Sequence, residues 1–147
     1  GHSPPVAALA WVAVPVAAAI EELMFRAWLP QLLGVWVAAP GVVYGITTIG
    51  FTLMHGVASP SDVVNHVVSG ACFAVLAWRT GGLAAPIVLH AASNLALRVL
   101  AALAPTAGDA TFTPSRLAGK LAALIVSTVI VVIWTRHDAA SCHVSAT

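Results

Sequence analysis

Long apolar stretches, each bounded by turn residues or charges, divide most of this sequence. One of them, LAALIVSTVIVVIW at residues 121–134, contains no ionisable side chain. A helix of about 20 such residues crosses the roughly 30 Å hydrocarbon core of a bilayer. Only 7% of the chain is charged and 60% is hydrophobic, whereas a soluble domain carries about 25% charged residues. Helices with so few charges have apolar outer faces, and lipid is the solvent that tolerates such faces.

Five stretches are candidates for membrane helices, and turn residues such as Gly34, the cluster Ser59-Pro60-Ser61-Asp62 and Gly81-Gly82 separate them. The first contains Pro30, where we expect a kink. The expected ranges are residues 6–29 with an extension to 33, then 41–57, 63–78, 83–103 and 117–134. The sequence therefore predicts an all-α fold, a polytopic transmembrane bundle of about five membrane helices.

Four regions follow from these boundaries. Residues 1–104 form the predicted core, and residues 105–116, which include Gly108 and Asp109, form a polar loop. Residues 117–135 form a C-terminal anchor helix that ends near Trp134, a typical interfacial residue. Residues 136–147 are small and polar, and we expect a frayed, flexible tail there. Because the chain opens on Gly-His-Ser-Pro-Pro without an initiator Met, we also expect further helices upstream in a longer protein.

Charge and cysteine content exclude two classes of protein. The net charge is +1 without a basic cluster, so we expect no nucleic acid partner, which would need grouped Lys and Arg. The two cysteines lie in different surroundings, Cys72 within an apolar run and Cys142 in the polar tail. We therefore expect no disulfide framework.

Ionisable and amide side chains nevertheless lie inside the apolar stretches. A charged side chain at the centre of a membrane helix costs about 2.5 to 3.5 kcal/mol on insertion scales, so each one indicates a partner or a function. They come from the first four predicted helices: Glu21, Glu22, Arg26, His55, His66, His90, Asn94 and Arg98. This concentration predicts a polar site within the bilayer.

Spacing assigns different roles to the two glutamates. Glu22 and Arg26 are four residues apart with the acid first, which is the favoured order for an ion pair on one helix face. Glu21 points about 100° away from Glu22 around the helix. It is therefore left as a spare carboxylate, suited to act as a general base.

The remaining site residues allow two kinds of chemistry. His90 and Asn94 are four residues apart on one helix face, and His55 must reach them from another helix. A water held between Glu21 and an imidazole could attack an amide, with the second imidazole and Asn94 stabilising the oxyanion. Alternatively, Glu21, His55 and His90 could ligate zinc, with water in the open position. The residues themselves leave both alternatives open.

Three motifs carry a resemblance to a known family. EELMFR (residues 21–26), FTLMHG (51–56) and HAASN (90–94) are similar, in order, to the Glu-Glu-x-x-x-Arg, Phe-x-x-x-His and His-x-x-x-Asn motifs of the CPBP family. These proteins are the CAAX-processing and bacteriocin-processing (Abi-type) intramembrane proteases, and the chain resembles type II CAAX prenyl endopeptidases among them. The resemblance covers roughly residues 6–104.

The resemblance implies a role for each matching residue. Glu21 and His55 would activate the water, His90 and Asn94 would support the oxyanion, and Glu22 and Arg26 would support the site. It implies an intramembrane endopeptidase, of the metallo or glutamate type, with zinc or another divalent metal or with no metal. The substrate would be a protein or peptide, either a lipidated CAAX tail or a bacteriocin leader. The expected location is the cell membrane, as a multi-pass protein of a bacterium.

Two residues and two other functions complete the sequence predictions. We interpret His66, which matches no motif, as a packing residue, and Arg98 as a counter-charge or a snorkelling side chain. A catalytically inactive immunity or scaffold protein of the same fold is an alternative function. A proton-coupled transporter is another, because buried Glu and His also form proton relays. A transporter would predict an internal repeat with broken helices, and none is evident in the sequence.

Overall fold

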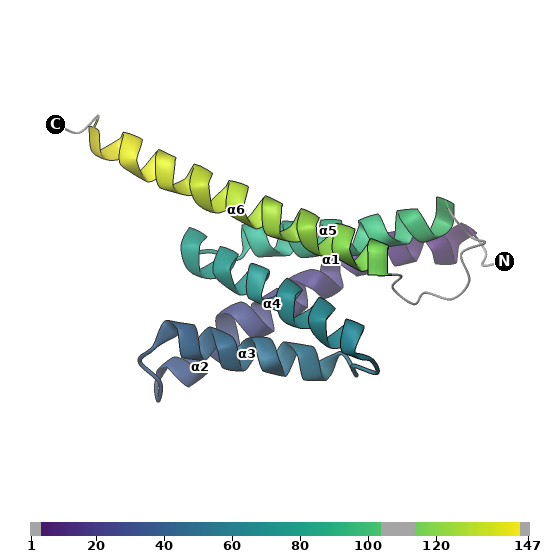
Figure 1. Ribbon diagram of the computed structural model, residues 1–147, viewed down its shortest axis with the longest axis horizontal. Helices are drawn as coiled ribbons and strands as arrows, with labels where there is room; N and C mark the ends of the chain where they lie inside the picture. Colours follow the sequence, from purple (N-terminus) through teal and green to yellow (C-terminus); the bar gives the residue numbers. More distant parts are fainter. Residues whose placement is uncertain (1–3, 104–113, 145–147) are drawn as a thin grey trace.

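Figure 1 shows a computed structural model of the protein, which describes residues 4–103 and 114–144. The described residues form helices and no strand, so the prediction of an all-α fold is confirmed. The elements are α1 (Pro4–Glu22), the π-helical η1 (Leu23–Trp28), α2 (Leu29–Gly34), α3 (Pro40–Met54), α4 (Pro60–Thr80), α5 (Ala84–Leu103) and α6 (Pro114–Val144).

Helix α4 is the centre of the bundle. It packs against α3, α5 and α6, while α1 packs along α5. Figure 1 shows α6 passing over α5, above α4 in this view, and then projecting past the other helices toward the C-terminus. Phe73 and Cys72 of α4 form a buried apolar cluster with Leu124 of α6. Cys72 is a free cysteine. The central position of α4 brings side chains of η1, α3, α5 and α6 to one place.

The first helix changes its winding directly after the two glutamates. Residues 4–34 are helical throughout, but η1 is a π-helix, which has more residues per turn. Pro30 lies in the first turn of α2, and a proline ring clashes with the carbonyl group four residues earlier, here that of Arg26. A wider turn relieves this clash, so the predicted kink takes the form of a π-helical turn. Glu21 consequently lies well inside one long helical segment.

Helix α4 begins and ends at specific capping residues. Ser59 is its N-cap, and the Ser59 hydroxyl accepts a hydrogen bond from the backbone N–H of Asp62 (3.2 Å), as in a capping box. At the other end Gly81 adopts the left-handed conformation with φ of 66°, which favours glycine after a helix. The helix therefore starts at Pro60, three residues before the predicted start at Val63, and its 21 residues suffice to cross a bilayer.

Helix α6 is longer than the sequence predicted. It starts at Pro114 and continues past Trp134 to Val144, so residues 136–144 are helical and do not form the frayed tail expected there. Most of the predicted polar loop, including Gly108 and Asp109, lies outside the described residues.

The outer surface of the helices is unusually apolar. Leu9, Ile49 and Ile130 are 69%, 59% and 60% exposed. The interior combines apolar side chains, such as Phe51 and Leu76, with several polar ones: Glu22, Arg26, Thr47, Asn65, Ser69 and His90. Among the described residues, Pro60–Thr80 and Pro114–Arg136 are long and apolar enough to span a membrane, and α3 and α5 contain shorter apolar helices. This surface fits a lipid environment.

Candidate active site

A buried chain of charged groups connects η1 with α5. The guanidinium Nε of Arg26 lies 3.3 Å from Oε2 of Glu22, so the predicted ion pair is confirmed. The other oxygen of Glu22, Oε1, lies 2.8 Å from Nδ1 of His90. Neither the Glu22 nor the Arg26 side chain is exposed. Glu22 therefore links the arginine to a histidine 68 residues later, and the sequence did not predict this second bond.

Arg26 is held by α4 as well as by Glu22. Its Nη2 donates a hydrogen bond to the carbonyl oxygen of Gly70 (3.1 Å). Its guanidinium carbon lies 4.4 Å from the ring centroid of Phe51 and 5.6 Å from that of Phe73, within the range of cation–π attraction. The arginine is thus fixed on several sides and in turn fixes Glu22.

Gly70 allows this close approach, and we expect Gly70→Ala to damage both stability and activity. A Cβ atom there would lie 3.0 Å from Cγ2 of Thr48 and 3.2 Å from Nη2 of Arg26. Such overpacking costs about 1 to 3 kcal/mol, measurable as a lower unfolding midpoint in detergent. Gly45→Ala in α3 is the matched control, because a Cβ there meets nothing within 4 Å. The control should be neutral or gain up to about 1 kcal/mol; equal behaviour of the two variants would contradict the argument.

Glu21 faces two imidazoles from different helices. Its Oε2 lies 3.5 Å from Nε2 of His55 and 3.8 Å from Nε2 of His90. Both distances exceed that of a direct hydrogen bond. Side chains from α1, α3 and α5 therefore converge, as their sequence motifs suggested. About a quarter of the Glu21 and His55 side chains is exposed, but Oε2 of Glu21 is buried without a hydrogen-bond partner among the described residues. His90 is buried as well.

The orientations of the two histidines have local causes. His55 is the C-cap of α3, where backbone carbonyls lack helical partners. Its Nδ1 bonds one of them, the oxygen of Phe51, at 2.7 Å, and Gly56 turns the chain away with φ of 60°. His90 stacks on the ring of Phe73, with centroids 4.6 Å apart and planes 18° apart. Each imidazole is thereby fixed with Nε2 toward Glu21.

These bonds determine where the protons lie. The Phe51 carbonyl only accepts, so Nδ1 of His55 carries its hydrogen, and Glu22 likewise fixes a hydrogen on Nδ1 of His90. With both imidazoles neutral, Glu21, Glu22 and Arg26 leave a net charge of −1 in a mostly buried cluster. Donation from Nε2 of His90 would require the doubly protonated ring, whose positive charge the Glu22 carboxylate would balance.

A cavity of about 190 Å³ adjoins both histidines. Asn94 lines it, as the helical spacing of His90 and Asn94 predicted. His66 and Lys120 also line it, and the ring of His66 lies 4.4 Å from that of His55. His66, interpreted from the sequence as a packing residue, thus packs next to the site. Arg98, by contrast, is exposed. The structure places Glu21, His55, His90 and Asn94 around one region, with Glu22 and Arg26 beside it.

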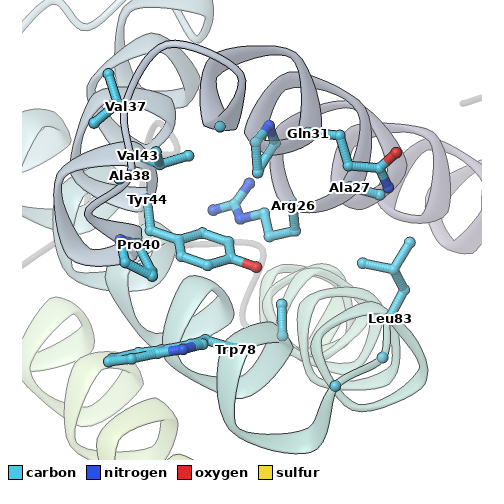
Figure 2. A pocket seen from close by; sticks show the side chains of 15 residues that line it. Arg26, Ala27, Gln31, Val37, Ala38, Pro40, Val43, Tyr44, Trp78 and Leu83 are labelled. Atoms are coloured by element: carbon cyan, nitrogen blue, oxygen red, sulfur yellow. The ribbon is translucent and has the colours of Figure 1, made fainter.

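A second cavity of about 510 Å³ lies on another side of Arg26. Figure 2 shows the side chains of Arg26 and Tyr44 within it, with Trp78 and Leu83 at its border. Nη1 of Arg26 is buried and has no hydrogen-bond partner among the described residues. Apart from these polar groups and Gln31, the lining is largely apolar. Arg26 consequently separates an apolar cavity from the glutamates.

A metal would need a suitable donor set. Metal-bound histidines commonly donate their second ring N–H to a carbonyl or carboxylate, and His55 and His90 both do so. However, no three His, Cys, Asp or Glu side chains in the described parts of the chain are arranged to hold a metal ion. The mechanism below therefore uses no metal, and the zinc site of Glu21, His55 and His90 stays a prediction.

A model of the family described as "Type II CAAX prenyl endopeptidase Rce1-like" matches residues 3–96. The chain belongs to this family. The predicted membership is thus confirmed, and no curated protein or solved structure matches significantly.

The Rce1-like match includes all three motifs and every predicted site residue. This family consists of CAAX-type endopeptidases, so membership supports an endopeptidase of the membrane at the level of the family. Lys120, however, lies outside the matched residues, in a helix to which the sequence assigned no chemistry. The available signal was an ionisable residue inside an apolar helix.

Proposed function

We propose that this protein is an intramembrane endopeptidase that hydrolyses a peptide bond with a water activated by Glu21 and His55. The observation that carries the proposal is the position of Glu21 Oε2, which lies near the Nε2 atoms of two imidazoles and has no hydrogen-bond partner among the described residues. Such a group can take a proton from a water without a competing permanent bond.

In the first step the water oxygen attacks the carbonyl carbon of the substrate, and its proton passes to Glu21. His55 orients the water through the lone pair of its neutral Nε2. The carbonyl oxygen becomes an oxyanion, which receives hydrogen bonds from the Nε2–H of His90 and from the amide of Asn94. Glu22 stabilises the charge on His90 throughout, much as a carboxylate does in a hydrolytic triad.

In the second step the tetrahedral intermediate collapses. The carbon–nitrogen bond breaks, and Glu21 returns its proton to the departing nitrogen, so that the carboxylate is regenerated. His90 keeps its proton and Asn94 its amide hydrogens. The products are a new carboxyl end and a new amino end.

The substrate is a protein or peptide that reaches a site embedded in a multi-pass helical bundle. The family name implies a prenylated tail, and the largely apolar lining of the cavity beside Arg26 suits an apolar chain. We therefore place the lipid part of a substrate in that cavity, next to Tyr44 and Trp78.

A peptidase assay on detergent-purified protein tests the proposal. The substrates are labelled peptides with the last four positions varied, each made with and without a prenyl group on cysteine. We expect the wild type to cleave peptides faster than the Glu21→Gln variant does, and to cleave prenylated peptides faster than unprenylated ones. Absence of cleavage from every peptide would instead favour the inactive immunity or scaffold alternative, and a proton flux without cleavage would favour transport.

Chelation tests the metal separately. Because the mechanism needs only Glu21, His55, His90 and Asn94, we expect activity to change less than about twofold after incubation with EDTA and removal of the chelator. The measurement is the initial cleavage rate before and after treatment. Loss of the rate with recovery on adding zinc would contradict the metal-free mechanism and restore the zinc prediction.

A further inference from the structure

Lys120 is a cation within the apolar helix α6 that reaches the cavity of the catalytic histidines. It lies in the second turn of α6, and its Nζ donates a hydrogen bond to Oδ1 of Asn65 on α4 (2.8 Å). Both residues line the cavity that His55, His90 and Asn94 also line. A lysine directed inward from a membrane span is costly, and such residues commonly mark the path of a substrate.

A second polar group in the same cavity lacks a partner. The side chain of Ser69, one turn after Asn65, is only 4% exposed, and its hydroxyl has no hydrogen bond within the described residues. A buried hydroxyl without a partner destabilises the fold, because its lost hydrogen bonds to water are not replaced. Because Ser69 also lines the cavity, a ligand with a hydrogen-bonding atom at this place would remove that destabilisation.

The part of the cavity that Lys120, Asn65 and Ser69 line is suited to bind an anion. An ammonium group, an amide and a hydroxyl together offer several hydrogen-bond donors, and those from a cation to a carboxylate are the strongest available. The two acids of the site, Glu21 and Glu22, are not among the residues that line the cavity. We propose that Lys120, Asn65 and Ser69 form a subsite for the C-terminal carboxylate of the substrate.

This inference rests on the proposed peptidase function and adds a rule for substrate choice. A volume of about 190 Å³ is smaller than the cavities that hold whole drug-sized ligands, about 300 Å³ or more. It accommodates the end of a chain and not an internal segment. Binding of the terminal carboxylate beside His90 and Asn94 would restrict cleavage to bonds near the C-terminus. Lys120 is then a specificity-determining residue contributed by a helix outside the family match.

The test compares three labelled, farnesylated peptides that are identical except at the end. The first ends in a free carboxylate and the second in a carboxamide. The third ends in a Glu residue whose own C-terminus is a carboxamide, so that only its side chain carries a carboxylate. Their dissociation constants are measured by fluorescence anisotropy on the detergent-purified Glu21→Gln protein, so that binding is read without turnover. The same peptides are offered to the wild type for cleavage, with the product mass determining the bond cut.

We expect the free carboxylate to bind roughly 10- to 100-fold more tightly than the carboxamide, as charge-assisted hydrogen bonds predict. The quantity compared is the dissociation constant of the carboxamide peptide divided by that of the carboxylate peptide. Lys120→Met should reduce this ratio to near one, whereas Lys120→Arg should retain most of it. Ser69→Ala should lower it a fewfold. Because the ratio is taken within each variant, a general loss of folded protein does not change it. Arg79→Gln is the control, since Arg79 is exposed and lies about 21 Å from Asn65 along α4.

The outcomes separate the two proposals. If the carboxylate peptide binds more tightly than the carboxamide peptide but the wild type cleaves neither, the peptidase function is rejected and the carboxylate subsite is retained. Cleavage by the wild type with a ratio near one, or with a ratio unchanged in Lys120→Met, would reject the subsite. If the peptide with a terminal Glu residue binds as tightly as the free carboxylate, an acidic side chain is the ligand and the C-terminal assignment is wrong.

Discussion

Glu21→Gln is expected to lower kcat/KM at least about a thousandfold while leaving the unfolding midpoint nearly unchanged. The amide has the size of the carboxylate but cannot take a proton from water, and a positioned general base contributes about 10² to 10⁴-fold. Little stability should be lost, because Glu21 Oε2 makes only contacts of 3.5 and 3.8 Å to imidazoles and the side chain is partly exposed. Initial rates on the best peptide of the assay, together with a thermal unfolding curve in detergent, measure both quantities.

Arg98→Gln is the matched control for Glu21→Gln. Arg98 is also an ionisable residue in an apolar helix, one turn beyond Asn94, but it is exposed. Its replacement should change kcat/KM less than about twofold. If Glu21→Gln kept a tenth or more of the wild-type activity, another group would have to be the base. His66 would then be the first candidate, because it lies against His55.

Local spacing predicted the parts of the site that lie on one helix. The ion pair of Glu22 with Arg26 and the shared face of His90 and Asn94 both follow from the helical repeat, which depends only on neighbouring residues. The bond from Glu22 to His90 joins residues 68 positions apart and depends on how α1 and α5 align. The residue pattern of one helix does not determine how it lies against another, so the spacing of residues could not predict the bond between Glu22 and His90.

The same distinction explains the errors in the helix boundaries. Composition predicted a frayed tail at residues 136–147, which begins with Arg, His and Asp. Helix α6 nevertheless continues to Val144, because adding a residue to an existing helix is far easier than starting one. Its inner face depends on packing against α4, and Lys120 reaches the site only through that packing. Sequence alone therefore could not predict that Lys120 belongs to the site, because it lies on a separate helix and in no motif.

Glu22→Gln should have the largest effect on stability, about 3 to 5 kcal/mol, and should also lower activity at least about a hundredfold. Removing the charge leaves Arg26 buried without its counter-ion, because neither side chain is exposed. It also takes from His90 the carboxylate that holds its Nδ1 hydrogen at 2.8 Å. The unfolding midpoint in detergent reports the first effect, and kcat/KM reports the second.

Combining Glu22→Gln with Arg26→Met separates these two roles. The double variant has no buried unpaired charge, and apolar replacement of a buried ion pair is commonly neutral for stability. Its unfolding midpoint should therefore recover most of what Glu22→Gln lost. Activity should stay low, because His90 still lacks the carboxylate that stabilises its positive charge as the oxyanion forms. Recovery of both quantities would mean that Glu22 serves only to neutralise Arg26. A low midpoint in both variants would mean that the hydrogen bond to His90, and not the ion pair, holds α1 against α5.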